Sequence, residues 1–201
     1  MQTTTNYTIK EKKQTHRLKR IFMVSLFGSI IFVVNMFLML LPPPVNYMFI
    51  APQAVLLALS GLFIKNVGAT YAGLIGGLLT ALGSPGLGIF TFIATTLFGT
   101  LVDTTFFIFK IKGSHTGVNR NRLIAAMAIS TMLIGIITYS VSVMSPNIFE
   151  KTGIPTLPLI IQRSYILDAM VIFMGPATGT TTGYAAAYLW NKYLKSLALT
   201  L

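Results

Sequence analysis

The sequence has 201 residues, of which 54% are hydrophobic and 9% are charged, whereas soluble domains usually contain about 25% charged residues. Cysteine is absent, which excludes disulfides and thiolate metal sites. The net charge of +11 does not indicate nucleic-acid binding, because the basic residues flank apolar segments, where membrane topology accounts for them. We therefore expect an all-α, polytopic membrane protein with almost no soluble domain.

The chain begins with a basic segment, residues 1–20, which we predict to be a cytosolic tail lying at the membrane surface. The following apolar stretch, 21–41, is longer than the core of a secretory signal and has no small-residue cleavage site after it. Its length is sufficient to cross the hydrocarbon core. We predict a transmembrane domain over 21–193 and a short cytosolic tail over 194–201.

Apolar runs, prolines and polar breaks divide the transmembrane domain into six predicted spans in one bundle. The predicted spans cover residues 21–41, 48–64, 67–82, 87–109, 123–144 and 164–190, and the last is broken by Gly175-Pro176. With the amino terminus inside, 13 of the 15 lysines and arginines fall in cytosolic segments, and only Lys151 and Arg163 fall outside. Positive charge favours the cytosolic side, so both termini are predicted to be cytosolic. Tyr188, Trp190 and Tyr193 also suit an aromatic belt at the inner interface.

The third predicted span, 67–82, carries small residues at four-residue steps on two adjoining faces. These residues are Gly68, Ala72 and Gly76 on one face and Ala69, Gly73 and Gly77 on the next. Small residues allow helix backbones to approach closely in lipid, where the hydrophobic drive between helices is weak. We expect this helix inside the bundle, either as a packing element or as the lining of a site. A tight Gly-Ser-Pro-Gly turn, 83–86, joins it to the next span.

Two acids lie within predicted spans, where a charge costs about 2.5–3.5 kcal/mol on insertion scales and usually has a partner or a role. Asp103 is near the cytosolic end of its span, and Asp168 is about one turn inside the outer end of the last span. In one interpretation they only anchor helix ends, through an Arg163–Asp168 pair or an Asp103–lysine pair. In the other, Asp168 and Arg163 face an outward pocket and Asp103 serves the cytosolic side.

Catalytic and nucleotide-binding motifs are not found. His16 and His115 lie in basic segments without a carboxylate at metal-ligand spacing, and no Walker-type glycine loop is present. The chain has four acidic residues in all, which leaves few candidates for hydrolysis by a pair of carboxylates. We predict a protein that is not an enzyme and that uses no cofactor and no metal.

The outer loops and outer halves of the helices contain polar and aromatic side chains of the kind that line small-molecule pockets. The same side chains would also suit interfacial anchoring. The candidate substrate-binding residues are Asn46, Tyr47, Gln53, Ser84, Tyr139, Arg163, Tyr165 and Asp168.

With these features the chain resembles the substrate-binding S components of energy-coupling factor (ECF) vitamin transporters, over most of residues 17–190. The first span has small residues four apart, Ser25 and Ser29 with Gly28 between them, where the family's usual motif is Ala-x-x-x-Ala. The glycine-rich third span and the segment from Gly99 to Asp103 are also similar. The stretch 78–87 resembles the thiamine or hydroxymethylpyrimidine class, although that class often has an acid in its third span and this chain has none.

The resemblance implies a prokaryotic cell-membrane protein that captures a vitamin or vitamin precursor in an outward-facing pocket. It also implies that Ser25, Gly28 and Ser29 contact a transmembrane coupling subunit driven by two cytosolic ATPase subunits. Thiamine or its pyrimidine moiety is the first hypothesis for the ligand. The alternatives are a standalone small carrier, a structural subunit of a larger membrane complex or, with least support, a membrane enzyme.

Overall fold

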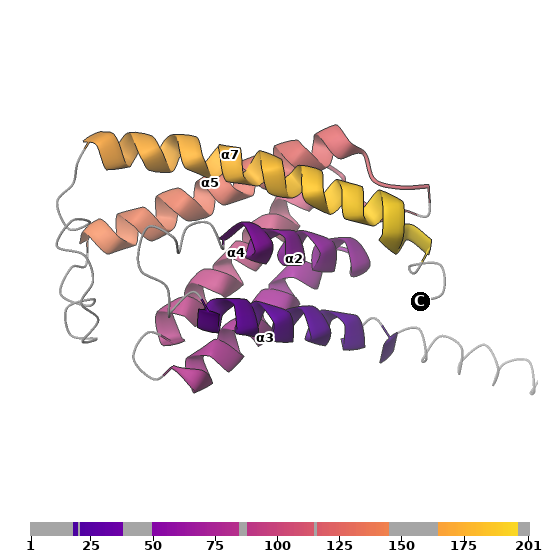
Figure 1. The fold of residues 1–201 in the computed structure, drawn as a ribbon, viewed down its shortest axis with the longest axis horizontal. Helices are drawn as coiled ribbons and strands as arrows, with labels where there is room; N and C mark the ends of the chain where they lie inside the picture. The colour runs from indigo at the N-terminus through magenta and orange to yellow at the C-terminus, as the bar shows by residue number, and fades with distance from the viewer. Residues whose placement is uncertain are drawn as a thin grey trace, which may run out of the picture.

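The structure is a computed structural model, and within the part of the chain that it describes every regular element is helical (Figure 1). The described residues are 18–19, 21–37, 50–84, 88–114, 116–144 and 165–196. The tail 1–17, the connections 38–49 and 145–164 and the last residues, 197–201, lie outside them.

The helices are the N-terminal helix (Ile21–Phe37), α2 (Ile50–Phe63), α3 (Gly68–Gly83), α4 (Gly88–Ile108), α5 (Arg120–Met144), α7 (Tyr165–Leu189) and the π-helical turn η2 (Trp190–Leu194). Most described boundaries lie within two residues of the predicted ones. The largest difference is after α7, where the helical backbone continues through η2 to residue 196, beyond the predicted end at 190. Helix α5 begins three residues earlier than predicted. Asn119 precedes its first residue, and the Asn119 Oδ1 accepts a hydrogen bond from the Arg122 amide at 3.3 Å, which is the action of an N-cap.

Glycines allow α3 and α4 to form a closely packed antiparallel hairpin. A Cβ atom at Gly73 would lie 2.5 Å from the Thr95 carbonyl oxygen, and one at Gly99 would lie 2.4 Å from the Ala69 carbonyl oxygen. Both obstacles are backbone atoms, so only glycine fits at this separation. The prediction that this stretch uses its small residues for close packing is confirmed.

The adjoining small-residue face of α3 packs against the N-terminal helix. A Cβ at Gly76 would lie 2.6 Å from Ile31 Cγ2, and one at Gly28 would lie 2.8 Å from Ile75 Cβ. Gly68, at the start of α3, is pressed against the Ser60 carbonyl oxygen of α2 in the same way. Helix α3 therefore contacts three neighbours, but Tyr71, Leu78 and Leu82 are 53%, 47% and 75% exposed along its remaining side. The helix is not enclosed on all sides, so the expectation that it lies inside the bundle holds only for its small-residue faces.

A second glycine stripe, on α7, joins this helix to α5. Cβ atoms at Gly175, Gly179 and Gly183 would all lie 3.0 Å or less from backbone atoms of α5. The four-residue spacing is the same as on α3, and the two helices run side by side over most of their length (Figure 1). Two pairs of helices, α3–α4 and α5–α7, are thus packed closely at glycines and make up most of the fold. Helix α2 packs against both pairs.

The predicted break at Gly175-Pro176 is wrong, because α7 continues through Pro176 without interruption. Helix α5 packs directly against this point, and Thr131 Oγ1 donates a hydrogen bond to the Gly175 carbonyl oxygen at 2.8 Å. Pro176 removes the amide that would donate to the Ile172 carbonyl, four residues earlier, and membrane helices tolerate such a proline where neighbouring helices support the backbone.

The single tryptophan, Trp190, is at the end of α7 and is only 1% exposed. Its ring packs edge-on against Phe63 with 5.0 Å between centroids, and Phe63 in turn meets Phe27 at 5.7 Å. The expectation that Trp190 belongs to an interfacial aromatic belt with Tyr188 and Tyr193 is therefore wrong for Trp190, whose ring joins the core. Tyr188 and Tyr193 are about half exposed.

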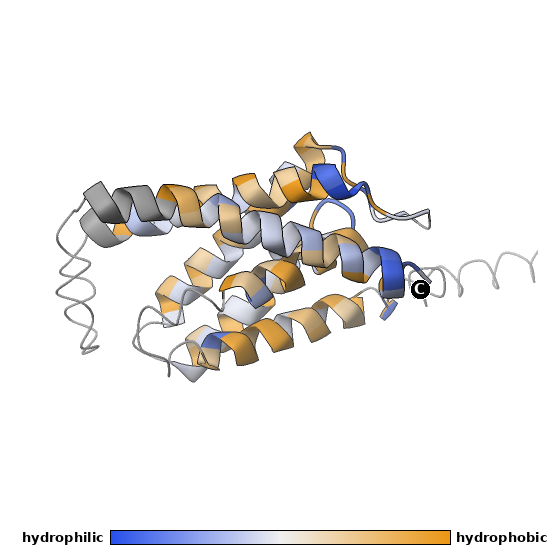
Figure 2. Ribbon diagram, turned by 45° about the horizontal axis from the view of Figure 1, so that its top comes forward, coloured by the Kyte–Doolittle hydropathy of each residue, from blue (hydrophilic) through white to orange (hydrophobic). Residues whose placement is uncertain are grey.

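Basic residues of the described part of the chain gather at one end of the bundle, which we call the basic end (Figure 2). They are Lys19, Lys65, Lys110, Lys112, Arg120, Arg122, Lys192 and Lys195. At this end α4 stops in a Schellman-type cap, in which Ile111 N donates to the Phe106 carbonyl oxygen at 2.8 Å and Lys110 adopts a positive φ of 53°. The other end, where α3 stops and α2 and α7 begin, is called the opposite end.

Two helices, Gly88–Ile108 and Arg120–Val141, are long and apolar enough to cross a membrane. The N-terminal helix, α2 and α3 are apolar but shorter. Large apolar side chains are exposed on the outer surfaces of the N-terminal helix, α4, α5 and α7, among them Phe22, Phe107 and Phe173. Such extensive exposed apolar surface is unusual for a soluble monomer, so these findings favour a membrane protein.

Candidate functional site

The candidate substrate-binding residues that the structure describes lie at the opposite end of the bundle. Gln53 is in the first turn of α2, Ser84 directly follows α3, and Tyr139 is near the end of α5. Tyr165 and Asp168 belong to the first turn of α7, where the backbone is described but the side chains are not. Asn46, Tyr47 and Arg163 lie outside the described residues.

Gln53 is buried, although it has a polar side chain in an apolar helix. A buried amide in a membrane bundle is costly unless it has a partner or borders a polar cavity. Ser84 is partly buried, and its hydroxyl lies 3.9 Å from the Met36 sulfur at the end of the N-terminal helix. The opposite end therefore has polar groups inside the bundle as well as on its surface.

Asn35 is a further buried polar residue at this end, and sequence reasoning missed it. It is 2% exposed, and its Nδ2 donates to Thr80 Oγ1 at 3.2 Å. Thr80 Oγ1 donates in turn to the Gly76 carbonyl oxygen at 2.7 Å. The signal was available, because Asn35 is the one amide side chain in an otherwise apolar span, and polar residues within spans usually face the interior.

Asp103 lies close to the basic end and accepts three hydrogen bonds from the first turn of α3. The donors are the Ala69 amide at 3.2 Å, the Thr70 amide at 2.7 Å and the Thr70 hydroxyl at 2.7 Å. The residue before α3, Val67, provides no side-chain cap. Asp103 therefore caps α3 from the neighbouring helix, and the cap replaces the Asp103–lysine pair considered from the sequence. A carboxylate is well suited to this place, because helix N-termini carry partial positive charge.

The predicted coupling-subunit residues lie on two different sides of the N-terminal helix. Gly28 faces inward, against Ile75 of α3. Ser29 is exposed, and its hydroxyl donates to the Ser25 carbonyl oxygen at 3.0 Å. Ser29 shares its exposed surface with the apolar residues Leu26, Ile30 and Val33. Ser29 is thus available for contact with another protein, whereas Gly28 acts within the fold.

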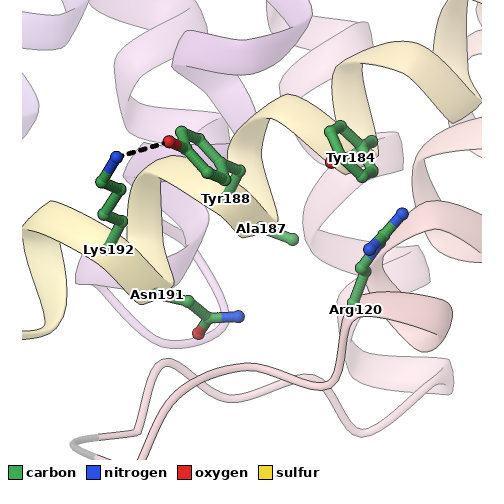
Figure 3. A pocket seen from close by; sticks show the side chains of 6 residues that line it. All are labelled: Arg120, Tyr184, Ala187, Tyr188, Asn191 and Lys192. Atoms are coloured by element: carbon green, nitrogen blue, oxygen red, sulfur yellow. Dashed lines mark hydrogen bonds between the residues drawn. The ribbon is translucent and has the colours of Figure 1, made fainter.

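A surface pocket of about 430 Å³ lies at the basic end, away from the predicted substrate-binding residues (Figure 3). It is formed where the start of α5 meets the end of α7. Its lining residues are Arg120, Tyr184, Ala187, Tyr188, Asn191 and Lys192.

Comparison of the chain with models of protein families, with curated proteins and with solved structures gives no match.

Proposed function

We propose that this protein is the membrane-embedded substrate-binding subunit of an uptake system for a small vitamin or vitamin precursor, with thiamine or its pyrimidine moiety as the first hypothesis. In this proposal a separate transmembrane coupling subunit and two cytosolic ATPase subunits supply the energy. The chain crosses a prokaryotic cell membrane six times and has both termini in the cytosol.

The grouping of basic residues at one end supports this orientation, since lysine and arginine favour the cytosolic side of a membrane. Helix α2 has 14 residues and is therefore about 21 Å long, which is less than the hydrocarbon core of about 30 Å. However, nine of its residues are buried by neighbouring helices.

The observation that carries the proposal is the position of the candidate substrate-binding residues. Those in the described part of the chain belong to elements that begin or end at the opposite end, which faces outward in the proposed orientation. The buried amides of Gln53 and Asn35 lie at the same end. Small-molecule pockets combine apolar walls with a few polar groups that fix the ligand, and this end offers such a combination.

The first test is mass spectrometry of small molecules that co-purify with the detergent-solubilised protein. A bound vitamin or precursor would support the proposal and identify the ligand. Protein purified from cells grown with thiamine and other vitamins, but containing no such molecule, would contradict it.

Asp168→Asn is expected to weaken binding of thiamine, which is positively charged, by about tenfold or more, because a hydrogen bond to a charged group contributes about 1.5–3 kcal/mol. Isothermal titration calorimetry with the full-length protein measures this effect. The uncharged hydroxymethylpyrimidine serves as the matched control, and its affinity should change much less. Equal thiamine affinity of variant and wild type would remove Asp168 from the pocket.

Ser29→Leu is expected to prevent co-purification with a coupling subunit while leaving ligand affinity unchanged. The reason is that Ser29 is exposed on the N-terminal helix, where a small side chain permits close approach of a second helix. Ser29→Ala retains the small size and should co-purify as the wild type does. If Ser29→Leu also co-purifies normally, the coupling subunit binds another surface.

A further inference from the structure

The pocket at the basic end is built from segments far apart in the sequence, and its geometry is fixed by hydrogen bonds. Asn191 Oδ1 accepts from the Val118 amide at 2.8 Å, and Asn191 Nδ2 donates to the Val118 carbonyl oxygen at 3.3 Å. The neighbouring Gly117 has a φ of 109°, and a Cβ there would lie 2.7 Å from Asn191 Oδ1. These contacts hold the segment before α5 against the end of α7.

The end of α7 has an uncommon backbone at this point. Residues Trp190–Leu194 form a π-helical turn, which changes the direction in which successive side chains point. Asn191 and Lys192, which line the pocket, both belong to this turn. Turns of this kind are rare and are frequently found at functional sites.

Two cations face the pocket, and each is placed against tyrosine. The guanidinium carbon of Arg120 lies 4.0 Å from the centre of the Tyr184 ring. Lys192 Nζ lies 2.7 Å from the Tyr188 hydroxyl and 5.1 Å from the centre of the same ring (Figure 3). A hydrogen bond to Tyr188 is the main cause, and one to Tyr193 the second cause, that raises the pKa of Lys192 above its ordinary value. Both favour the charged amine.

Within the described residues neither Arg120 nor Lys192 forms an ion pair. The only carboxylate whose side chain is described, that of Asp103, is bound to the start of α3. Stacking of a guanidinium on a ring leaves its N–H donors, which lie at the edge of the planar group, available to an oxyanion. The lining of the pocket therefore carries two positive charges that are available to a ligand with negative charge.

An exposed side of α7 leads from this pocket toward the opposite end of the bundle. Tyr188, Tyr184 and Phe173 are 47%, 45% and 75% exposed and lie on this side at multiples of three to four residues. The exposed Thr180 and Thr181 lie between Tyr184 and Phe173. Half-exposed tyrosines near helix ends are typical of the membrane interface. A soluble anion would not contact these exposed rings, whereas the acyl chain of a lipid would lie along them.

We propose that this pocket binds the phosphate group of an anionic phospholipid from the cytosolic leaflet, with Arg120 and Lys192 as the charged contacts and an acyl chain along the exposed side of α7. Basic pockets between membrane helices on the cytosolic side bind such headgroups. The inference rests on the orientation given in the proposed function, but not on the identity of the transported ligand.

The test compares phosphatidylglycerol with phosphatidylcholine in mixed micelles containing the full-length protein, with the melting temperature and native mass spectrometry as readouts. Wild-type protein should be stabilised by phosphatidylglycerol and retain it in the mass spectrum. The double variant Arg120→Gln/Lys192→Gln should bind it at least about 100-fold more weakly, since each direct hydrogen bond to a charged group contributes about 1.5–3 kcal/mol.

The matched control is Lys65→Gln/Arg122→Gln, which removes two exposed charges from the same end but outside the pocket. It should bind phosphatidylglycerol as the wild type does. An equal loss of affinity for phosphatidylglycerol in both double variants would overturn the proposal, because the loss would then reflect the total positive charge of this end and not the pocket. Both double variants should melt at the wild-type temperature without anionic lipid, since the substituted side chains are exposed.

Two other outcomes would also overturn the lipid site. Stabilisation by inorganic phosphate alone, abolished by Arg120→Gln/Lys192→Gln, would identify a soluble phosphate compound as the ligand. Loss of coupling-subunit binding in this variant, with unchanged lipid binding, would identify a protein contact. Selective lipid binding by a protein that captures no vitamin would support the lipid site and contradict only the proposed function.

Discussion

Replacing Gly73 or Gly99 with alanine is expected to destabilise the protein by about 1–3 kcal/mol, the usual cost of forcing extra atoms into a packed interior. The added methyl group would meet the Thr95 or the Ala69 carbonyl oxygen at 2.5 Å or less. Backbone atoms cannot rotate away as a side chain can, so α3 and α4 would have to separate along their length.

The sign of this effect is informative, because helix propensity alone predicts the reverse. Alanine favours a helix over glycine by about 1 kcal/mol, so a loss of stability measures the interhelical contact. Thermal unfolding in detergent provides the measurement, with Thr104→Ala on the exposed side of α4 as the control. In the double variant the two effects should not add, since a Cβ at Gly73 would lie only 3.6 Å from the Gly99 Cα. Stabilisation by either alanine would contradict the tight hairpin.

Asp103→Asn is the second substitution with a large expected effect. It should lower the free energy of unfolding by about 1–3 kcal/mol, which is the cost of leaving buried hydrogen-bonding groups unsatisfied. The two amides that Asp103 binds, those of Ala69 and Thr70, occupy the second and third positions of α3, where an N-cap side chain normally acts. An asparagine keeps one acceptor but turns an N–H₂ group toward amides that also need an acceptor.

A double-mutant cycle with Thr70→Val separates this cap from general effects of removing a charge. Thr70 donates both its amide and its hydroxyl to Asp103, so the two substitutions should show an interaction energy of about 0.5 kcal/mol or more. The melting temperature in detergent is the readout, and Thr104→Ala again serves as the control. Additive effects would mean that the hydrogen bond from the Thr70 hydroxyl to Asp103 does not contribute to the cap, since valine keeps the backbone amide.

The positions of the helices could be predicted because they depend on local pattern. Apolar runs bounded by prolines, glycines and basic residues mark each element, and most described helix ends lie within three residues of the predictions, the exception being the helical continuation of α7 through η2. The small-residue spacing on 67–82 likewise predicted close packing, because a helix places every fourth residue on the same side. The same spacing at Gly175, Gly179 and Gly183 would have predicted the face of α7 that meets α5.

The candidate sites were predicted less completely, because they depend on which helix faces meet. The sequence placed Gln53, Ser84 and Tyr139 toward one end, and the helix directions agree. It did not reveal Asn35 beside Thr80, and it assigned Trp190 to the interface although the ring lies in the core. An isolated side chain in an apolar span has no local signal for its partner.

By itself the sequence determined that this protein is helical, apolar and positively charged around its helix ends, because each of these properties depends only on residues that are close together in the sequence. Only the tertiary structure decided that Asp103 caps a helix more than 30 residues away and that Arg120, Tyr184 and Lys192 line one pocket. Such pairings follow from the packing of backbone against backbone at glycines, and this packing fixes neighbours that no local periodicity specifies.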